Sequence, residues 1–402
     1  MTLTRRDALR NLFIWMAGSP LLRAQQEIQY TPERIPLIDD LVNVLEFEPV
    51  AKTKIPKQNY DFIAGGVDSE WTLRRNREAF QWITLRPRML TNEKQIDLSL
   101  ELFGQKLEMP ILVAPTGAQG LSHPEGELAM VRGAGAAKTI DCVSSNTSFP
   151  IDKIGDAATF PIWFQLYPGP DLAGTRERVE RAVAAGAKAI AFTVDTPYNS
   201  HRERLLRDRV AQEVPPGASS STLVDRPTRR PRVAPAAPHP YHLTRRFTAE
   251  LGWSFVDELV SYAKVPVLTK GILTPEDAKK SIEHGAAGVI VSNHGARYLD
   301  TAPSTIEVLP EIVDAVGGKG TVLIDGGFRR GTDILKALAI GAKAVLVGRP
   351  PLWGLGAYGQ AGVTRVLELL QTELALAMGL SGYPTLASIN RSLVHIEVPP
   401  RR

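Results

Sequence analysis

The stretch that decides the fold reads AAGVIV at residues 286–291 and continues as SNHGARYLD at residues 292–300. Six uninterrupted apolar residues are typical of a strand buried on both faces, as in a parallel sheet. The polar part carries His294 and Arg297, a base that titrates near neutral pH beside a permanent cation. This pair suits removal of a proton from a substrate that bears a carboxylate. An ordinary surface loop is the alternative, and the stretch alone does not decide between them.

Similar apolar runs recur along the chain and alternate with helical patterns, which is typical of βα units. Eight parallel strands with helices between them predict an α/β fold, the (β/α)₈ TIM barrel. The strands are expected at 111–114, 140–144, 161–166, 189–194, 266–269, 288–291, 322–324 and 344–347. The intervening helices are expected at 125–138, 151–157, 171–186, 253–264, 275–285, 304–316 and 332–341.

Two segments extend this barrel, which we place at 110–380 within a domain covering 30–402. Residues 30–108 form an N-terminal helical extension, with helices expected at 37–47, at 57–64 and from Trp71 onward. After the fourth strand, a long basic loop at 196–250 is too rich in proline and glycine for a regular element. The loop could bind an anionic substrate, contact a membrane surface peripherally, or simply be solvated.

The composition indicates a globular enzyme-sized chain of 402 residues with 44% hydrophobic and 22% charged residues. A net charge of +4 gives no reason to expect nucleic-acid binding. The single cysteine, Cys142, excludes a Cys-based zinc site, and no metal site is expected. Residues 1–24 pair Arg5 and Arg6 with a short apolar run, which resembles a bacterial twin-arginine signal peptide and predicts export to the periplasm. A short N-terminal helix on a cytoplasmic protein is the alternative.

The strand exits carry polar residues or glycines, and a barrel of this kind builds its active site at the carboxyl ends of its strands. Two glycines, Gly326 and Gly327, allow close approach to a ligand, and Gly348 with Arg349 leads into a helix. These exits predict a phosphate site, hence a phosphorylated cofactor or substrate, while the absence of a dinucleotide or Walker motif argues against NAD and ATP. The other exits contribute Pro115, Thr116, Gly117, Ser144, Gln165, Tyr167, Thr193, Asp195, Lys270, Ser292, His294, Arg297, Asp325 and Arg329.

Three motifs in this order resemble those of the FMN-dependent α-hydroxy acid dehydrogenases and oxidases, a family that includes glycolate oxidase and L-lactate dehydrogenase. They are FQLY at 164–167, SNHGARYLD at 292–300 and DGGFRRGTD at 325–333. The resemblance extends from about Lys54 to the C-terminus. It implies an FMN cofactor and oxidation of a small (S)-2-hydroxy acid to the 2-oxo acid.

The resemblance also implies the catalytic roles. His294 would be the base that takes a proton while two electrons pass to the flavin, by a carbanion or by a hydride route. Asp195 would orient His294 and stabilise its imidazolium. Arg297 would bind the substrate carboxylate with Arg202 nearby, and Tyr167 would hydrogen-bond the oxygen that is oxidised.

For the cofactor, the resemblance implies a set of contacts around the barrel mouth. Lys270 would stabilise the reduced, anionic flavin ring. Asp325 would bind the ribityl chain. The remaining implied contacts are Ser144, Gln165, Thr193 and Ser292 to FMN, Pro115, Thr116 and Gly117 along its ring, and Gly326, Gly327, Arg329, Gly348 and Arg349 around its phosphate.

Three positions depart from the family pattern. Phe62 stands where many members have a tyrosine that donates to the substrate carboxylate, a hydrogen bond worth roughly 1.5–3 kcal/mol. Asn146 replaces a larger apolar or aromatic residue and suggests a more polar pocket. Gly117 stands where several oxidases have alanine, which favours a dehydrogenase that uses another electron acceptor.

We therefore expect a dehydrogenase whose acceptor is a quinone or a cytochrome rather than oxygen. An oxidase that uses oxygen and releases peroxide is the first alternative. A flavin-binding protein with little turnover, or a barrel enzyme acting on a phosphorylated metabolite, are the others. Relatives also suggest a homotetramer.

Overall fold

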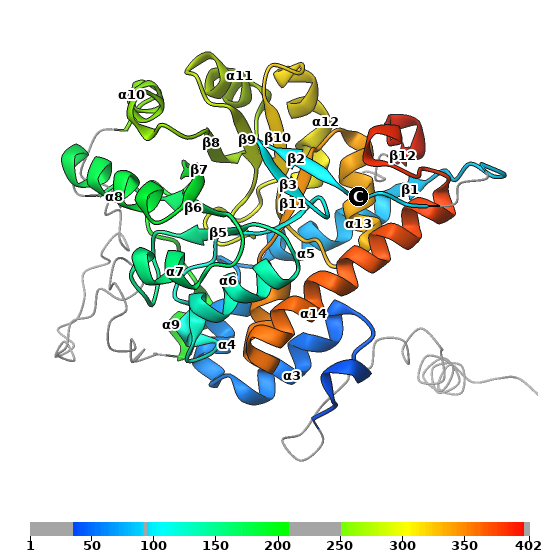
Figure 1. The fold of residues 1–402 in the computed structure, drawn as a ribbon, viewed down its shortest axis with the longest axis horizontal. Helices are drawn as coiled ribbons and strands as arrows, with labels where there is room; N and C mark the ends of the chain where they lie inside the picture. Colours follow the sequence, from blue (N-terminus) through cyan, green and yellow to red (C-terminus); the bar gives the residue numbers. More distant parts are fainter. Residues whose placement is uncertain (1–34, 92–94, 170, 209–250, 398–402) are drawn as a thin grey trace, which may run out of the picture.

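The computed structural model describes residues 35–91, 95–169, 171–208 and 251–397. Eight parallel strands form a closed barrel in the order β10-β11-β4-β5-β6-β7-β8-β9 (Figure 1). Every strand expected from the sequence is present, so the (β/α)₈ prediction is confirmed. The strands are β4 (Ile111–Val113), β5 (Asp141–Ser144), β6 (Ile162–Leu166), β7 (Ala187–Thr193), β8 (Val267–Ile272), β9 (Gly288–Val291), β10 (Thr321–Ile324) and β11 (Ala344–Val347).

Helices follow the strands and surround the barrel, and their bounds agree closely with the sequence periodicity. The last, α14, continues directly from the eighth strand and changes direction at Tyr358 and Gly359, where the backbone leaves helical geometry. The barrel helices are α6 (Gly126–Ala136), α7 (Ile151–Ala157), α8 (Leu172–Ala184), α10 (Ser254–Ala263), α11 (Pro275–Glu283), α12 (Thr305–Val316), α13 (Gly331–Ile340) and α14 (Arg349–Ser381).

The N-terminal extension differs in part from expectation. The helix predicted at 37–47 is wrong: the chain forms two short 3₁₀ turns, η2 (Ile38–Asp40) and η3 (Val44–Glu46), and then the helix α3 (Phe47–Lys54). Pro49 lies in the first turn of α3, where proline is accepted, and this agrees with a helix that begins at Phe47. The helix at 57–64 is confirmed as α4 (Lys57–Ala64), and α5 (Trp71–Glu78) begins at Trp71.

Two small antiparallel sheets were not predicted. Strand β1 (Ile83–Leu85) pairs with β12 (Val394–Ile396), which fixes the C-terminal segment to the extension. Strands β2 (Leu100–Leu102) and β3 (Gln105–Leu107) form a hairpin whose leucines pack on the barrel interior. The indole nitrogen of Trp163 donates to Gln105 Oε1 at 2.8 Å, so the hairpin seals the barrel at the amino-terminal ends of its strands.

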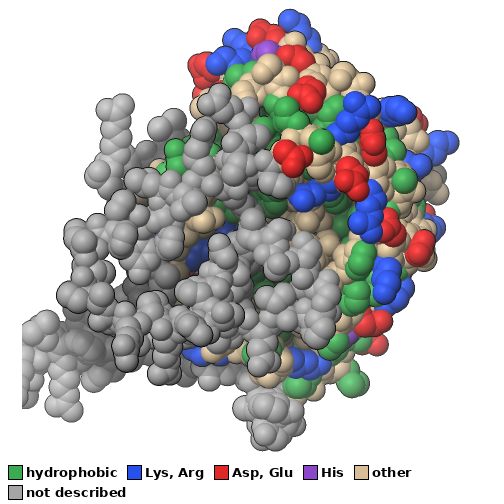
Figure 2. All heavy atoms as spheres, turned by 90° about the vertical axis from the view of Figure 1, so that its left-hand side faces the viewer, with side chains coloured by type: hydrophobic (Ala, Val, Ile, Leu, Met, Phe, Trp, Pro, Cys, Tyr) green, Lys and Arg blue, Asp and Glu red, His purple; other side chains and the backbone are tan. Residues whose placement is uncertain are grey.

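The extension and the start of the long connection meet over the opposite end of the barrel. Helix α3 packs on α14, and α9 (Glu203–Asp208), at the start of that connection, packs on α4 (Figure 1). The predicted signal at 1–24 and most of the loop at 196–250 lie outside the described residues, so those predictions stay predictions. Within the described ranges, no helix is long and apolar enough to cross a membrane. Figure 2 shows cationic and anionic side chains interspersed on one face.

Asp141, the first residue of β5, is an unusual member of the core. Its side chain is buried, and neither carboxylate oxygen has a hydrogen-bond partner among the described residues. Burial, followed by the nearby charge of Glu127, raises the pKa of the Asp141 carboxyl well above its ordinary value of 3.8. The folded protein therefore favours the protonated form of this carboxyl.

We expect Asp141→Asn to stabilise the protein at alkaline pH. Below the ordinary pKa of 3.8 the Asp141 carboxyl is protonated whether the chain is folded or not. As pH rises, the unfolded chain ionises first, and the free energy of unfolding falls until the raised pKa is reached. At pH 8 the substitution should add ~1–3 kcal/mol to the free energy of unfolding, and near pH 4 it should add nothing. Urea denaturation at both pH values measures this, with Asp152→Asn, at an exposed ion pair with Arg181, as the control that should give no gain.

Candidate active site

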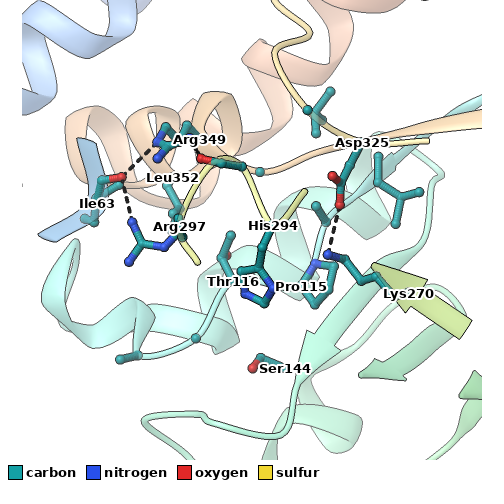
Figure 3. Close-up of a pocket in the computed structure, with 18 of the residues that line it drawn as sticks. Ile63, Pro115, Thr116, Ser144, Lys270, His294, Arg297, Asp325, Arg349 and Leu352 are labelled. Atoms are coloured by element: carbon teal, nitrogen blue, oxygen red, sulfur yellow. Dashed lines mark hydrogen bonds and ion pairs between the residues drawn. The ribbon is translucent and has the colours of Figure 1, made fainter. Parts of the chain in front are cut away.

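The strand exits enclose one open cavity of about 1070 Å³ at the carboxyl ends of the barrel strands. In Figure 3, His294 lies between Arg297 on one side and the Lys270–Asp325 pair on the other, with Pro115 and Thr116 close by. The lining includes the predicted residues Phe62, Pro115, Thr116, Gly117, Ser144, Asn146, Tyr167, Arg202, Lys270, His294, Arg297, Asp325, Gly326, Gly327, Arg329, Gly348 and Arg349.

His294, just beyond β9, is held at both ring nitrogens. Its Nδ1 lies 3.0 Å from Asp195 Oδ1, and its Nε2 lies 3.2 Å from the Tyr167 hydroxyl. Burial lowers the pKa of the His294 imidazole below 6.5 even though Asp195 acts in the opposite direction. The pKa of Asp195 is lowered as well: burial would raise it, but the charge that His294 carries when protonated, the hydrogen bond from His294 and the charge of Lys270 outweigh burial. A neutral imidazole beside an ionised carboxylate can accept a proton on Nε2.

Lys270, in β8, forms a buried ion pair with Asp325 beyond β10. Its Nζ lies 3.0 Å from Asp325 Oδ2 and donates to Ser292 Oγ at 2.9 Å. Burial would lower the pKa of Lys270, but Asp325 and then Asp195 outweigh it and raise the pKa. Lys270 is therefore a fixed positive charge at the mouth. The other oxygen of Asp325 is buried and has no partner among the described residues, as expected of an acceptor that awaits a ligand hydroxyl.

Three neighbouring strand ends are linked by one glutamine. Gln165 Oε1 accepts from Ser144 Oγ at 3.1 Å, and Gln165 Nε2 donates to Thr193 Oγ1 at 2.8 Å. All three side chains are buried. The sequence identified these residues singly, and the structure shows that they form one network from β5 to β7.

Arg297 and Arg349 both donate to the carboxyl end of α4. Arg297 Nη1 donates to the carbonyls of Phe62 at 2.8 Å and Gly65 at 3.1 Å. Arg349 donates to the carbonyls of Ile63, Gly65 and Gly295 at 2.9–3.0 Å. These arginines therefore fix α4 over the cavity, a role that no local sequence pattern signals, because the carbonyls lie more than 200 residues away along the chain.

Phe62 forms part of the wall facing these cations. The Arg297 guanidinium carbon lies 4.9 Å from the centre of the Phe62 ring, and that of Arg202 lies 5.5 Å from it. A ring face attracts a guanidinium, so Phe62 keeps both arginines at the cavity without the hydroxyl of a tyrosine.

Arg329 follows β10 in the chain and lines the cavity. Burial lowers its pKa to about 9, and the nearby charges of Arg77 and Arg349 act in the same direction. Burial also lowers the pKa of Arg349 to about 10. No carboxylate within the described ranges forms an ion pair with Arg329. Two guanidinium groups gathered this way fit a phosphate, which would supply the missing negative charge.

Two glycines are fixed by neighbours that sequence reasoning did not connect. A Cβ on Gly117 would lie 2.7 Å from the carbonyl oxygen of Asn146. Gly117 and Asn146, two of the positions that depart from the family pattern, are therefore in direct contact. Gly271 was not predicted at all. It has φ +110°, and a Cβ there would lie 2.6 Å from Asp195 Cβ, so only glycine lets Asp195 reach His294.

Comparison with known proteins agrees with this geometry. A family model described as FMN-dependent dehydrogenase matches residues 51–396. The chain belongs to the FMN-dependent α-hydroxy acid dehydrogenase and oxidase family. It is 42% identical to glycolate oxidase 1 of Zea mays over 89% of this chain and 96% of that protein. It is 43% identical to an L-lactate oxidase of Nostoc sp. over 89% of this chain and 99% of that protein.

A crystal structure of mandelate oxidase matches with a TM-score of 0.80 and 38% identity over 89% of this chain and 99% of that chain. The chain is thus an FMN-dependent hydroxy acid oxidoreductase. The cavity fits FMN in two respects: the buried, unpartnered oxygen of Asp325 and the two guanidinium groups of Arg329 and Arg349 that line it. Asp325 would hold the ribityl chain, and Arg329 and Arg349 the phosphate.

We expect Arg329→Gln to weaken FMN binding by the hydroxy acid oxidoreductase. Loss of a hydrogen bond between charged groups costs roughly 1.5–3 kcal/mol, which is about tenfold or more in the dissociation constant. Titration of the apoprotein with FMN, followed by quenching of flavin fluorescence, measures the change. The matched control is Arg330→Gln, because Arg330 pairs with Glu373 at 3.1 Å and does not line the cavity. Equal affinities for the two variants would contradict the phosphate assignment.

Proposed function

We propose that the enzyme oxidises an (S)-2-hydroxy acid to the 2-oxo acid and passes the electrons to an acceptor other than molecular oxygen. The observation that carries the proposal is the His294 side chain, with Nε2 beside Tyr167 and Nδ1 held by Asp195. When bound, FMN would accept the two electrons together with the second hydrogen lost by the substrate, while His294 takes the first as a proton. All other steps use residues of this chain.

His294 is the proposed base. With its pKa lowered by burial, the imidazole is neutral at pH 7 and takes one proton from the substrate on Nε2. Asp195 then stabilises the imidazolium, because its carboxylate stays ionised and lies 3.0 Å from Nδ1. Tyr167, whose hydroxyl lies 3.2 Å from His294 Nε2, would hydrogen-bond the substrate oxygen while the carbon that bears it is oxidised.

Arg297 is the proposed carboxylate ligand. Burial, followed by the nearby charges of Arg202 and Arg349, lowers the pKa of Arg297 well below its ordinary value. A substrate carboxylate would relieve this repulsion, so binding of an anion is favoured at this point. Arg202, whose guanidinium faces the rings of Phe62 and Tyr298, would add to the attraction.

The choice of acceptor rests on Gly117. Several oxidases have alanine at this position, and here the Asn146 carbonyl lies 2.7 Å from where the extra methyl would stand. Oxidation by molecular oxygen is the second candidate, because the matched relatives carry the names glycolate oxidase and L-lactate oxidase. We also propose export by the twin-arginine route, a homotetramer and a peripheral membrane contact of the basic loop.

Anaerobic mixing of the FMN-loaded enzyme with a panel of (S)-2-hydroxy acids tests the reaction. We expect at least one to bleach the flavin absorbance, and His294→Asn to slow bleaching by about 10²–10⁴-fold. The control is His284→Asn, because His284 pairs with Asp257 at 2.8 Å outside the cavity. The bleaching rate should be constant from pH 7 to 8 and fall only as the pH drops below 6.5, the ordinary His294 pKa. If none of the acids bleached the flavin, the proposed reaction would be contradicted, and the alternative of a flavin-binding protein with little turnover would be favoured.

Reoxidation of the bleached enzyme tests the acceptor. We expect a soluble quinone analogue or a cytochrome to restore the flavin absorbance faster than air-saturated buffer does. The amount of hydrogen peroxide formed per flavin gives a second measurement. Fast reoxidation in air with one peroxide per flavin would instead establish the oxidase.

A further inference from the structure

We propose that Asn76, on α5, is a positioning residue that holds the catalytic loop around His294 in its working conformation. The proposal rests on the base role of His294 given above. It assigns a reaction-specific task to a helix of the N-terminal extension that does not line the cavity.

The loop needs external support because its backbone is strained. His294, Gly295 and Ala296 have φ values of 56°, 62° and 64°, three consecutive residues in the left-handed region. Only one of the three is a glycine. Non-glycine residues in this region persist when the surrounding structure over-determines them, and such strain gathers at functional sites.

Asn293 connects the strained loop to the surrounding structure. Its backbone carbonyl accepts from Ala296 N at 2.9 Å, and its side-chain Oδ1 accepts from the same nitrogen at 3.3 Å. The backbone carbonyl closes the turn that contains His294, and the Asn293 side chain adds a second acceptor for the same N–H. The side chain must stay in one orientation to do so, since a rotated amide would present its NH₂ group to Ala296 N.

Asn76 fixes that orientation together with the carbonyl of Pro303, which accepts from Asn293 Nδ2 at 3.1 Å. Asn76 Nδ2 donates to Asn293 Oδ1 at 2.9 Å, and Asn293 Nδ2 donates back to Asn76 Oδ1 at 2.7 Å. Both residues are buried, with relative exposures of 2% and 5%. A reciprocal amide pair away from water accepts one arrangement of donors and acceptors, because any other leaves buried polar groups unmatched.

Helix α5 is itself anchored to the loops on either side of the pair. Asp300, further along the His294 loop, accepts from Thr72 N at 2.9 Å at the start of α5. At its other end, Arg77 contacts the carbonyl of Gly327 and pairs with Asp333 at 2.8 Å. Gly327 packs so closely on the Asn76 carbonyl that a Cβ would lie 2.0 Å from it. The helix thus connects the base loop with the proposed phosphate site.

The test compares Asn76→Asp and Asn76→Ser with the control Arg75→Gln in the FMN-loaded full chain. Arg75 is the neighbouring α5 residue, and it anchors the helix through Glu307 rather than through the His294 loop. We expect both Asn76 variants to bind FMN and to show a limiting rate of anaerobic flavin reduction lowered by about tenfold or more. The control should keep the wild-type rate.

The pH profile separates positioning from a purely structural role. A His294 ring that has moved from Asp195 loses the interaction that raises its pKa. The acid limb of flavin reduction should therefore move to lower pH in the Asn76 variants and stay in place in the control.

Wild-type rates or an unshifted acid limb in the Asn76 variants would overturn the proposal. Loss of FMN binding or of folding in both variants would also overturn it, because the amide pair would then serve stability alone. Failure of the proposed function looks different, since the wild-type enzyme itself would then show no flavin reduction.

Discussion

Closure of the barrel is the constraint on which the rest of the structure depends. Leu112 of β4 pairs with Leu346 of β11, so every barrel strand is hydrogen-bonded on both edges and all run in one direction. Parallel closure brings every carboxyl end to one rim. Residues from Pro115 to Arg349 therefore meet around a single cavity, although more than 230 residues separate them in the sequence. The hairpin β2–β3 seals the other end and leaves this rim as the place for chemistry.

The charged side chains make the rim of the cavity attractive to anions. The Lys270–Asp325 pair is internally balanced, whereas burial and mutual repulsion lower the pKa values of Arg297, Arg329 and Arg349. A cavity with this excess of positive charge favours anions at two points, one beside His294 and one beyond β10. In the proposed function, a substrate carboxylate would occupy the first point and the phosphate of FMN the second. The proposed base, His294, lies beside the first of these points.

The N-terminal extension covers the cavity and also contacts the side chains that line it. Carbonyls at the end of α4 accept from Arg297 and Arg349, and α5 carries the Asn76 amide that pairs with Asn293. Phe62 completes this layer, with two guanidinium groups on its ring. The residues that would contact the substrate are therefore aimed by a segment that precedes the barrel in the chain. Substitutions in α4 and α5 should be interpreted with this coupling in mind.

The sequence by itself determined the eight strands, their connecting helices and the residues at the strand exits, because a βα repeat and buried apolar runs are local patterns. It also indicated FMN through three family motifs. The tertiary structure alone decided the hairpin seal, the Gln165 network, the contact between Gly117 and Asn146, and the pairing of Asn76 with Asn293. These depend on side chains far apart in the chain, and no local periodicity encodes which distant polar groups will meet once the barrel has closed.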